Sequence, residues 1–225
     1  MNAGFKPRLE VLPPAQRRLW PGLRPAAALG FVLYGGTAIA LRLAHRTSVD
    51  FDFFSEKSLD REAIEAAFPF MSASTVVQDL RNTLSLLVPY GNAAEDQVKL
   101  SFFGDIQFGR TATPDTTEDG VLQVAALDDL LATKVKVILQ RVESKDYRDV
   151  AALLVAGVSL PKALAAARQM FGPNFQPSES LKAMVYFEGG DLGTLGEEEK
   201  NILTRAAGSV RELPPVTILS KRLAA

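Results

Sequence analysis

The stretch FVLYGGTAIALRLAHRTSVDFDFF, residues 31–54, decides the fold predicted for this chain. Its first four residues, 31–34, are apolar and aromatic, which favours a buried strand, and two glycines stop this run. Thr37 then predicts the N-cap of a helix over residues 38–44, which are mostly strong helix formers. Residues 49–54 alternate apolar and acidic side chains, which is the period of a strand. We therefore predict a strand, a glycine turn, a helix and a second strand that returns beside the first.

The rest of the chain predicts more strands first and helices afterwards. Before residue 125 we expect a helix over 59–67, strands over 74–79, 83–90, 97–103 and 121–124, and a loop over 109–120. After it we expect helices over 127–143, 145–156, 160–171, 179–188 and 197–207. This order predicts an α+β or α/β fold with a mixed sheet flanked by helices. The predicted division is an extended N-terminal arm over 1–24 with a short helix at 15–19, a core over 25–125 and a helical region over 126–225.

Composition excludes several kinds of site. The chain has 225 residues, no cysteine and a single histidine, so it can build neither a thiolate zinc site nor a multi-histidine metal site. The net charge of −1 gives no general attraction to nucleic acid or to an anionic membrane. No apolar run approaches the roughly 20 residues that span a bilayer. We therefore expect a cytoplasmic protein with no membrane partner, whose chemistry rests on carboxylates, lysines and backbone amides.

Asp50 and Asp52 are the strongest candidates for such chemistry. On a strand, residues two apart point to the same face, so the two carboxylates should emerge side by side. Carboxylate oxygens suit Mg²⁺, which takes one or two carboxylates together with substrate phosphates. The alternative is a half-exposed strand whose acids pair with Arg42 and Arg46. The opposite face should anchor the strand in the core through Val49, Phe51 and Phe53.

The stretch 31–54 also resembles the start of the nucleotidyltransferase fold of the DNA polymerase β-like superfamily. Within that superfamily the stretch most closely resembles the AbiEii/AbiGii family, the nucleotidyltransferase toxins of toxin–antitoxin and abortive-infection systems. Three motifs carry it: GGTAIA, HRTSVDFDFF, and KVKVILQRVESKDYRD at residues 134–149. The resemblance implies an enzyme that uses Mg²⁺ to transfer a nucleoside monophosphate from an NTP to a hydroxyl group. It also implies tRNA or a protein as acceptor, and a cognate antitoxin as partner.

The resemblance also implies roles for individual residues. Asp50 and Asp52 would hold Mg²⁺, and Lys134, or in its place Lys136, would hold the triphosphate. Asp149 would orient that lysine or contact the nucleotide. The other residues implied at the nucleotide are Gly35, Gly36, Thr37, Arg46, Ser48 and Lys145. Gly35, Gly36 and Thr37 would face the phosphates, and Arg46 and Ser48 could flank the acidic strand and orient it.

The residues of the third motif also have a simpler interpretation. A solvated helix start explains the charges from Lys145 onward, with Asp146 favourable near the helix N-terminus and Lys145 placed to pair with Asp149. Lys134 differs, because it lies in a mostly apolar helix and needs an anionic partner or a path to solvent.

The chain departs from the superfamily pattern on the strand predicted over 97–103. Active relatives carry a third carboxylate there, and the matching position here is Ser101, with Lys99 on the same face. Serine is a weak Mg²⁺ ligand, and Lys99 could neutralise the aspartates without a metal. Asp96 or Asp105 could substitute for the missing carboxylate. The alternative function is therefore a catalytically impaired descendant of the fold that binds a nucleotide or a partner protein.

Overall fold

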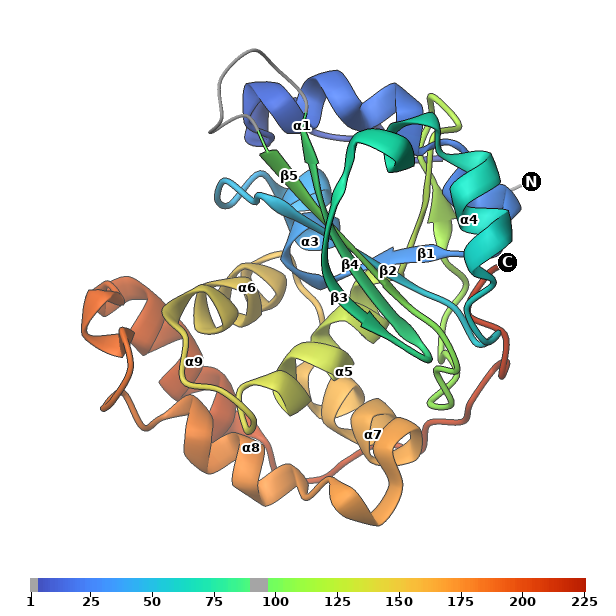
Figure 1. Cartoon of the computed structure of the whole chain (residues 1–225). Coiled ribbons are helices and arrows are strands. Elements are labelled where there is room, and N and C mark those ends of the chain that lie inside the picture. The colour runs from blue at the N-terminus through green and yellow to red at the C-terminus, as the bar shows by residue number, and fades with distance from the viewer. Residues whose placement is uncertain (1–3, 90–96) are drawn as a thin grey trace. The chain divides into compact units, whose positions relative to one another are not determined.

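A computed structural model describes residues 4–89 and 97–225 of the chain (Figure 1). Residue 90, the predicted end of one strand, and Asp96 lie outside the described residues. The chain divides into two compact units. Unit 1 comprises residues 1–109, 113–125 and 221–225, and unit 2 comprises residues 110–112 and 126–220.

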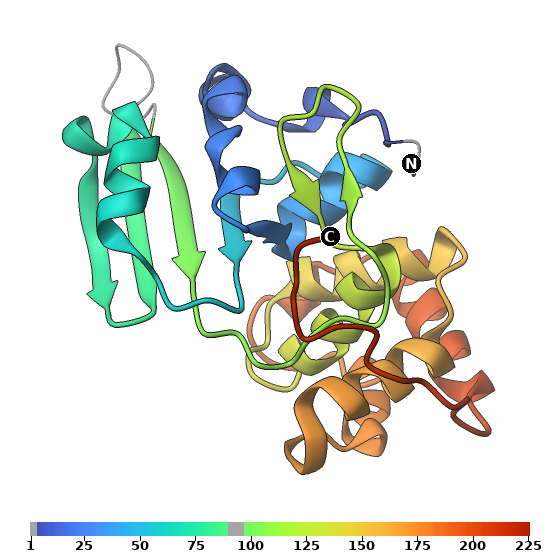
Figure 2. The same ribbon diagram turned by 90° about the vertical axis from the view of Figure 1, so that its right-hand side faces the viewer.

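Unit 1 is built on a seven-stranded mixed sheet, seen from a second direction in Figure 2. The strand order is β3-β4-β5-β2-β1-β7-β6. Strand β2 runs parallel to β5 and β1 runs parallel to β7, whereas every other neighbouring pair is antiparallel. This architecture confirms the predicted mixed sheet with helices. The strands are β1 (Val32–Tyr34), β2 (Asp50–Phe54), β3 (Thr75–Leu80), β4 (Thr83–Pro89), β5 (Gln97–Phe103), β6 (Asp115–Thr116) and β7 (Gln123–Val124).

The stretch that decided the fold forms β1, α3 (Gly35–Leu43) and β2. Strand β2 returns beside β1, as predicted; the two strands are antiparallel, with Tyr34 opposite Asp52. The predicted helix start is wrong, because α3 begins at Gly35 with Tyr34 as its N-cap, and Thr37 lies inside the first turn. Val49 was also predicted wrongly as a core residue: it precedes β2 and is 50% exposed.

An aromatic core holds β2 in place from the face opposite the aspartates. Phe51 and Phe53 are fully buried, and the ring of Phe53 stacks on that of Phe102 from β5 at 5.3 Å between centroids. Burying a side chain of this size stabilises a fold by about 1.5–3 kcal/mol. The acidic strand is therefore anchored on one face by apolar contacts, which leaves its other face for polar side chains.

The N-terminal segment is packed and does not form an extended arm. The predicted short helix exists as α1 (Pro14–Leu19), but Leu12, Leu19 and Trp20 are buried, and the indole nitrogen of Trp20 donates to a carboxylate oxygen of Asp119 at 2.7 Å. The remaining helical elements of unit 1 are η1 (Leu9–Val11), η2 (Trp20–Leu23), α2 (Pro25–Ala28), α4 (Arg61–Ala67) and η3 (Pro69–Ala73).

The described part of unit 2 is helical. Its helices are α5 (Leu127–Val137), α6 (Ser144–Val155), α7 (Leu160–Phe171), α8 (Pro177–Met184) and α9 (Glu197–Ser209), with short turns η4 (Gly172–Asn174) and η5 (Leu192–Thr194). Helix α5 ends six residues before its predicted end at residue 143. There the amides of Leu139 and Gln140 bond to carbonyls three residues back, which tightens and closes the helix.

Each unit includes a short segment that is distant in sequence from the rest of it: residues 110–112 in unit 2 and residues 221–225 in unit 1. In unit 2, the carboxylate of Asp129 accepts hydrogen bonds from the amides of Thr111 and Ala112 and from the Thr111 hydroxyl. In unit 1, the amide of Leu223, whose side chain is fully buried, donates to Glu56 at 3.1 Å. Across residues 4–89 and 97–225, every helix is too short or too polar to span a membrane.

Candidate active site

Asp50 and Asp52 lie on β2 as the sequence predicts. Both are half-buried, whereas Phe51 between them is fully buried on the opposite face. In the register with β5, Asp50 is opposite Lys99 and Asp52 is opposite Ser101. The two carboxylates therefore share one face of β2, which pairs with β5 from Asp50 onward and with β1 from Asp52 onward.

Gly35 brings the backbone of the first turn of α3 against Asp52. Its φ angle is +75°, a conformation that favours glycine, and a Cβ atom built there would lie 2.7 Å from Oδ2 of Asp52. Nothing larger than glycine fits between this turn and the carboxylate. The first amides of a helix have no partner inside the helix and favour negative charge, so the turn can face an anion.

Replacement of Gly35 by alanine should separate the turn from Asp52. We expect Gly35→Ala to lower the free energy of unfolding by about 1–3 kcal/mol, because it adds both a strained φ and a contact shorter than real Cβ atoms make. Gly157→Ala is the matched control, since Gly157 has φ +85° with no atom within 4 Å of the added Cβ. Urea unfolding of both variants measures the difference. Equal losses would contradict a role for the contact with Asp52.

The neighbouring strand supplies no third carboxylate. Ser101 is buried, and its hydroxyl accepts a hydrogen bond from Ser85 at 3.1 Å. Lys99 is exposed, and no ion pair joins it to Asp50 or Asp52 within the described residues. Asp105 lies in a loop, where its carboxylate accepts from the side chain of Gln107 at 2.7 Å.

The donor set fits one Mg²⁺ ion better than two. In the described part of the chain, no group of three or more histidine, cysteine or acidic residues is placed so that it could hold a metal ion. Two oxygen ligands on one strand face, beside a turn that can receive phosphates, match the way Mg²⁺ is held by one or two carboxylates plus substrate. Asp50 and Asp52 would hold such an ion.

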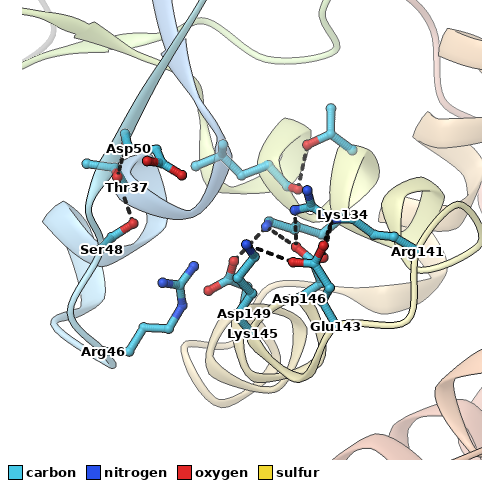
Figure 3. A network of polar contacts seen from close by, with 12 residues as sticks. Thr37, Arg46, Ser48, Asp50, Lys134, Arg141, Glu143, Lys145, Asp146 and Asp149 are labelled. Atoms are coloured by element: carbon cyan, nitrogen blue, oxygen red, sulfur yellow. Dashed lines mark hydrogen bonds and ion pairs between the residues drawn. The ribbon is translucent and has the colours of Figure 1, made fainter. Parts of the chain in front are cut away.

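Thr37 and Ser48 form a buried contact beside Asp50 (Figure 3). The hydroxyl oxygens of the two residues are 2.7 Å apart, and the Thr37 hydroxyl also bonds to the main-chain carbonyl of Asp50. The alternative pairing with Arg42 is wrong, because Arg42 forms its ion pair with Asp115 at 2.9 Å. Arg46 donates to the carbonyl of Thr47 at 3.0 Å.

The third motif forms a cluster within unit 2 that is centred on Lys134. This lysine lies on α5 and is 5% exposed; its Nζ is 2.7 Å from Asp146 and 2.6 Å from Asp149, both fully buried on α6 (Figure 3). Arg141 donates to the other oxygen of Asp146 at 2.7 Å. The anionic partner that Lys134 was expected to need is thus a pair of carboxylates.

Neither aspartate belongs to the solvated helix start of the simpler interpretation, since both are fully buried. The predicted pair of Lys145 with Asp149 is wrong too: Lys145 pairs with Glu143 at 2.7 Å. Lys136, the competitor of Lys134, donates to the carbonyl of Asn174 at the surface. Of the two lysines, only Lys134 is held by acids.

Charge balance lowers the pKa of Asp146. Burial alone would raise this pKa, but the hydrogen bond from Arg141 and the charge of Lys134 outweigh burial and hold it below the ordinary value. An acid with a depressed folded-state pKa contributes stability above its unfolded-state pKa of about 3.9 and loses it as the pH falls through the folded-state pKa.

We therefore expect stability at Asp146 to depend on pH in a defined direction. Asp146→Asn should lower the urea midpoint at pH 7. The gap from the unsubstituted protein should begin to shrink below about pH 4, where the unfolded state takes up a proton, and it should close as the pH falls through the lower folded-state pKa. Urea unfolding from pH 3 to 7 measures this gap. A gap that stays constant over this range would contradict the depressed pKa.

The sequence analysis did not predict that Asp146 and Arg141 belong to the Lys134 cluster. The sequence nevertheless contains a signal for Asp146. Asp146 and Asp149 are followed at helical spacing by Val150 and Leu153, which are fully buried. Residues at i, i+3, i+4 and i+7 share one helix face, so the two acids continue the apolar stripe of α6. Acids in line with a core stripe indicate a buried charged partner.

Comparison with known proteins agrees with these features. The family model described as nucleotidyl transferase AbiEii toxin, type IV toxin–antitoxin system, matches residues 18–201, which include both clusters. The chain belongs to the AbiEii family. It is a nucleotidyltransferase-type toxin of a toxin–antitoxin system by this membership, as the resemblance of the three motifs predicted.

Other proteins are similar to this AbiEii-family chain. An uncharacterized protein of Aquifex aeolicus is 30% identical over 161 residues, which cover 70% of this chain and 74% of the relative. A provisionally assigned nucleotidyltransferase from H. pylori has a TM-score of 0.59 at 16% identity and covers 86% of this chain and 92% of its own. MenT4, a nucleotidyltransferase toxin from Mycobacterium tuberculosis, has a TM-score of 0.58 at 14% identity. The match covers 90% of this chain and 84% of the MenT4 chain. At these identities the two structures show a shared fold.

Proposed function

We propose that this protein transfers a nucleoside monophosphate from an NTP to a hydroxyl group of an acceptor. The observation that carries the proposal is the placement of Asp50 and Asp52 on one face of β2, with Oδ2 of Asp52 against the glycine turn that begins α3. Membership of the AbiEii family supports it.

The proposed reaction is an in-line displacement at phosphorus. The acceptor oxygen forms a bond to the α-phosphorus, the bond from the α-phosphorus to the pyrophosphate leaving group breaks, and the acceptor hydroxyl gives up its proton to solvent. Such reactions depend mainly on positioning and on charge neutralisation. When bound by Asp50 and Asp52, Mg²⁺ would neutralise charge on the triphosphate. The first amides of α3, at Gly35 and Gly36, would receive phosphate oxygens.

In the cluster around Lys134, the contacts indicate a role for Asp149. We propose that Asp149 orients Lys134, because the two are 2.6 Å apart and both are buried. A triphosphate contact by Lys134, by the exposed Lys145 or by the half-buried Arg46 stays a prediction from the family resemblance. Three further predictions stay proposals: a core over residues 25–125 with a helical region over 126–225, a cytoplasmic location, and partners that comprise an antitoxin and a tRNA or protein acceptor.

One observation favours a second function. Ser101 stands beside Asp52 where active relatives carry an acid, and it is already bonded to Ser85. Serine has no carboxylate, so it cannot replace an acid as a metal ligand or as a base. A protein that binds an NTP without transferring it would need only the glycine turn and the two aspartates.

Incubation with each α-labelled NTP, Mg²⁺ and either total tRNA or a cell protein extract tests the proposal. Label on an acceptor that is lost without Mg²⁺ supports transfer. Calorimetric titration with each NTP, in Mg²⁺ and in EDTA, accompanies it. Binding with no label on any acceptor favours the second function, and absence of both binding and label contradicts each of them.

A further inference from the structure

The hydroxyls of Thr37 and Ser48 form a chain that ends on the backbone of Asp50 (Figure 3). Thr37 is 2% exposed and Ser48 is 6% exposed, so neither hydroxyl faces bulk water. The family resemblance placed both residues at the nucleotide, with the first at the phosphates. Their contacts point to a different task.

Counting protons fixes the direction of this chain. A hydroxyl carries one hydrogen, and a carbonyl oxygen can only accept. The Thr37 hydrogen therefore goes to the Asp50 carbonyl, and the oxygen of Thr37 accepts the hydrogen of Ser48. Both donors are then used. A phosphate oxygen also needs a donor, so the Thr37 hydroxyl could bind one only by releasing the carbonyl of Asp50.

The backbone of Asp50 lies where the sheet gives it support on one side only. On the β5 side it is opposite Lys99, but on the β1 side the pairing ends with Tyr34 opposite Asp52, because the chain then turns into α3. Thr37, in the first turn of α3, supplies the bond that a longer β1 would have supplied. A buried carbonyl without a partner would be costly.

We propose that Thr37 and Ser48 are positioning residues: their hydroxyls bind the first turn of α3 to the backbone of Asp50, and neither hydroxyl contacts the nucleotide. This inference rests on the proposed function of the two aspartates. It makes the glycine turn and the carboxylate of Asp50 one rigid frame, in which the site for phosphates and the site for the metal keep a fixed separation.

Three variants separate positioning from direct binding. Thr37→Val keeps the shape of the side chain and removes the hydroxyl, whereas Thr37→Ser keeps the hydroxyl and removes the methyl group. Ser48→Ala removes only the donor to Thr37. Each variant is measured by amide hydrogen exchange at residues 50–52, by NTP affinity in EDTA, and by the kcat of transfer with its dependence on Mg²⁺ concentration.

Positioning predicts a specific pattern. Thr37→Val should speed exchange at residues 50–52 by about tenfold or more and lower kcat by about 10- to 100-fold, while NTP affinity in EDTA stays within about twofold. More Mg²⁺ should be needed for half-maximal rate. Thr37→Ser should restore both exchange and kcat. Ser48→Ala should act in the same direction, with a combined effect in the double variant below the product of the two, because both residues act through one chain.

Opposite results would overturn the inference. Loss of NTP affinity in EDTA that matches the loss of kcat would make Thr37 a phosphate ligand, and unchanged exchange would mean that the hydroxyl does not hold the strand. If the unsubstituted protein neither binds NTP nor transfers label, the proposed function fails. The exchange rates of Thr37→Val and Thr37→Ser still decide the positioning role in that case.

Discussion

Replacing Asp52 by asparagine is expected to lower kcat/KM for nucleotide transfer by about 100-fold or more, because removal of one group that stabilises transition-state charge costs this much in other enzymes. Asparagine keeps the size of the side chain against Gly35 and removes its charge. Asp52 lies opposite Ser101, so β5 supplies no carboxylate that could replace it, and Asp50 would be the one acid left on this face of β2. Transfer of α-labelled NTP to the acceptor measures the loss.

Asp79→Asn is the matched control for this experiment. Asp79 lies on β3, which β4 and β5 separate from β2, and its carboxylate is bonded to Arg61 at 2.7 Å near the surface. Loss of an exposed pair of this kind costs about 0–1 kcal/mol, so transfer should persist. Retention of the full rate by the Asp52→Asn protein would eliminate β2 as the catalytic strand.

Lys134→Met is expected to be the most destabilising substitution, with a loss of about 3–5 kcal/mol in the free energy of unfolding. Methionine matches the length of the lysine stem but removes the cation 2.6 Å from Asp149 and 2.7 Å from Asp146. Both acids are fully buried, so water cannot compensate for the lost charge. Urea unfolding, monitored by circular dichroism, measures the change.

A second substitution and a control sharpen this test. Adding Asp149→Asn to Lys134→Met should recover part of the stability, since it removes one of the two buried acids. Lys136→Met should cost less than about 0.5 kcal/mol, because Lys136 bonds only a surface carbonyl among the described contacts. Equal losses for the Lys134 and Lys136 variants would refute the buried cluster.

The arrangement of β1, α3 and β2 was predictable because its causes are local. Alternation around Phe51 and Phe53 predicts which face of β2 is buried, and the glycine pair predicts where β1 must turn. Both signals depend on residues within one or two positions of each other. The sequence therefore predicted the placement of Asp50 and Asp52 correctly.

Interactions between distant residues explain the parts that were predicted wrongly. Thr37 has the side chain of a good N-cap, but its partner is the carbonyl of Asp50, 13 residues away, and the helix begins two residues earlier at Gly35. Asp146 looks like a favourable acid at a helix start, but its burial is explained by its ion pairs with Lys134, 12 residues away, and with Arg141. Local sequence preferences predict the kind of position that a residue occupies, but they do not predict which distant residue it contacts.

The N-terminal segment shows the same limit. Its prolines predict an extended arm, because proline interrupts regular structure, yet Leu12, Leu19, Trp20 and Leu23 are almost completely buried. A proline at the first position of a helix is tolerated, as in α1, so this segment makes short helices and packs them. The apolar residues between the prolines were therefore the better indication that this segment is packed.

The division of the chain affects the order in which the protein can be assembled during its synthesis. Unit 1 includes residues 221–225, whereas residues 126–220 all belong to unit 2. The bonds from Leu223 to Glu56 and from Ala225 to Gln123 join residues 167 and 102 positions apart. Contacts this distant in sequence form late. The ribosome must therefore translate all of residues 126–220 before unit 1 can be completed. A nascent chain that stops at residue 220 lacks part of the unit that carries Asp50 and Asp52.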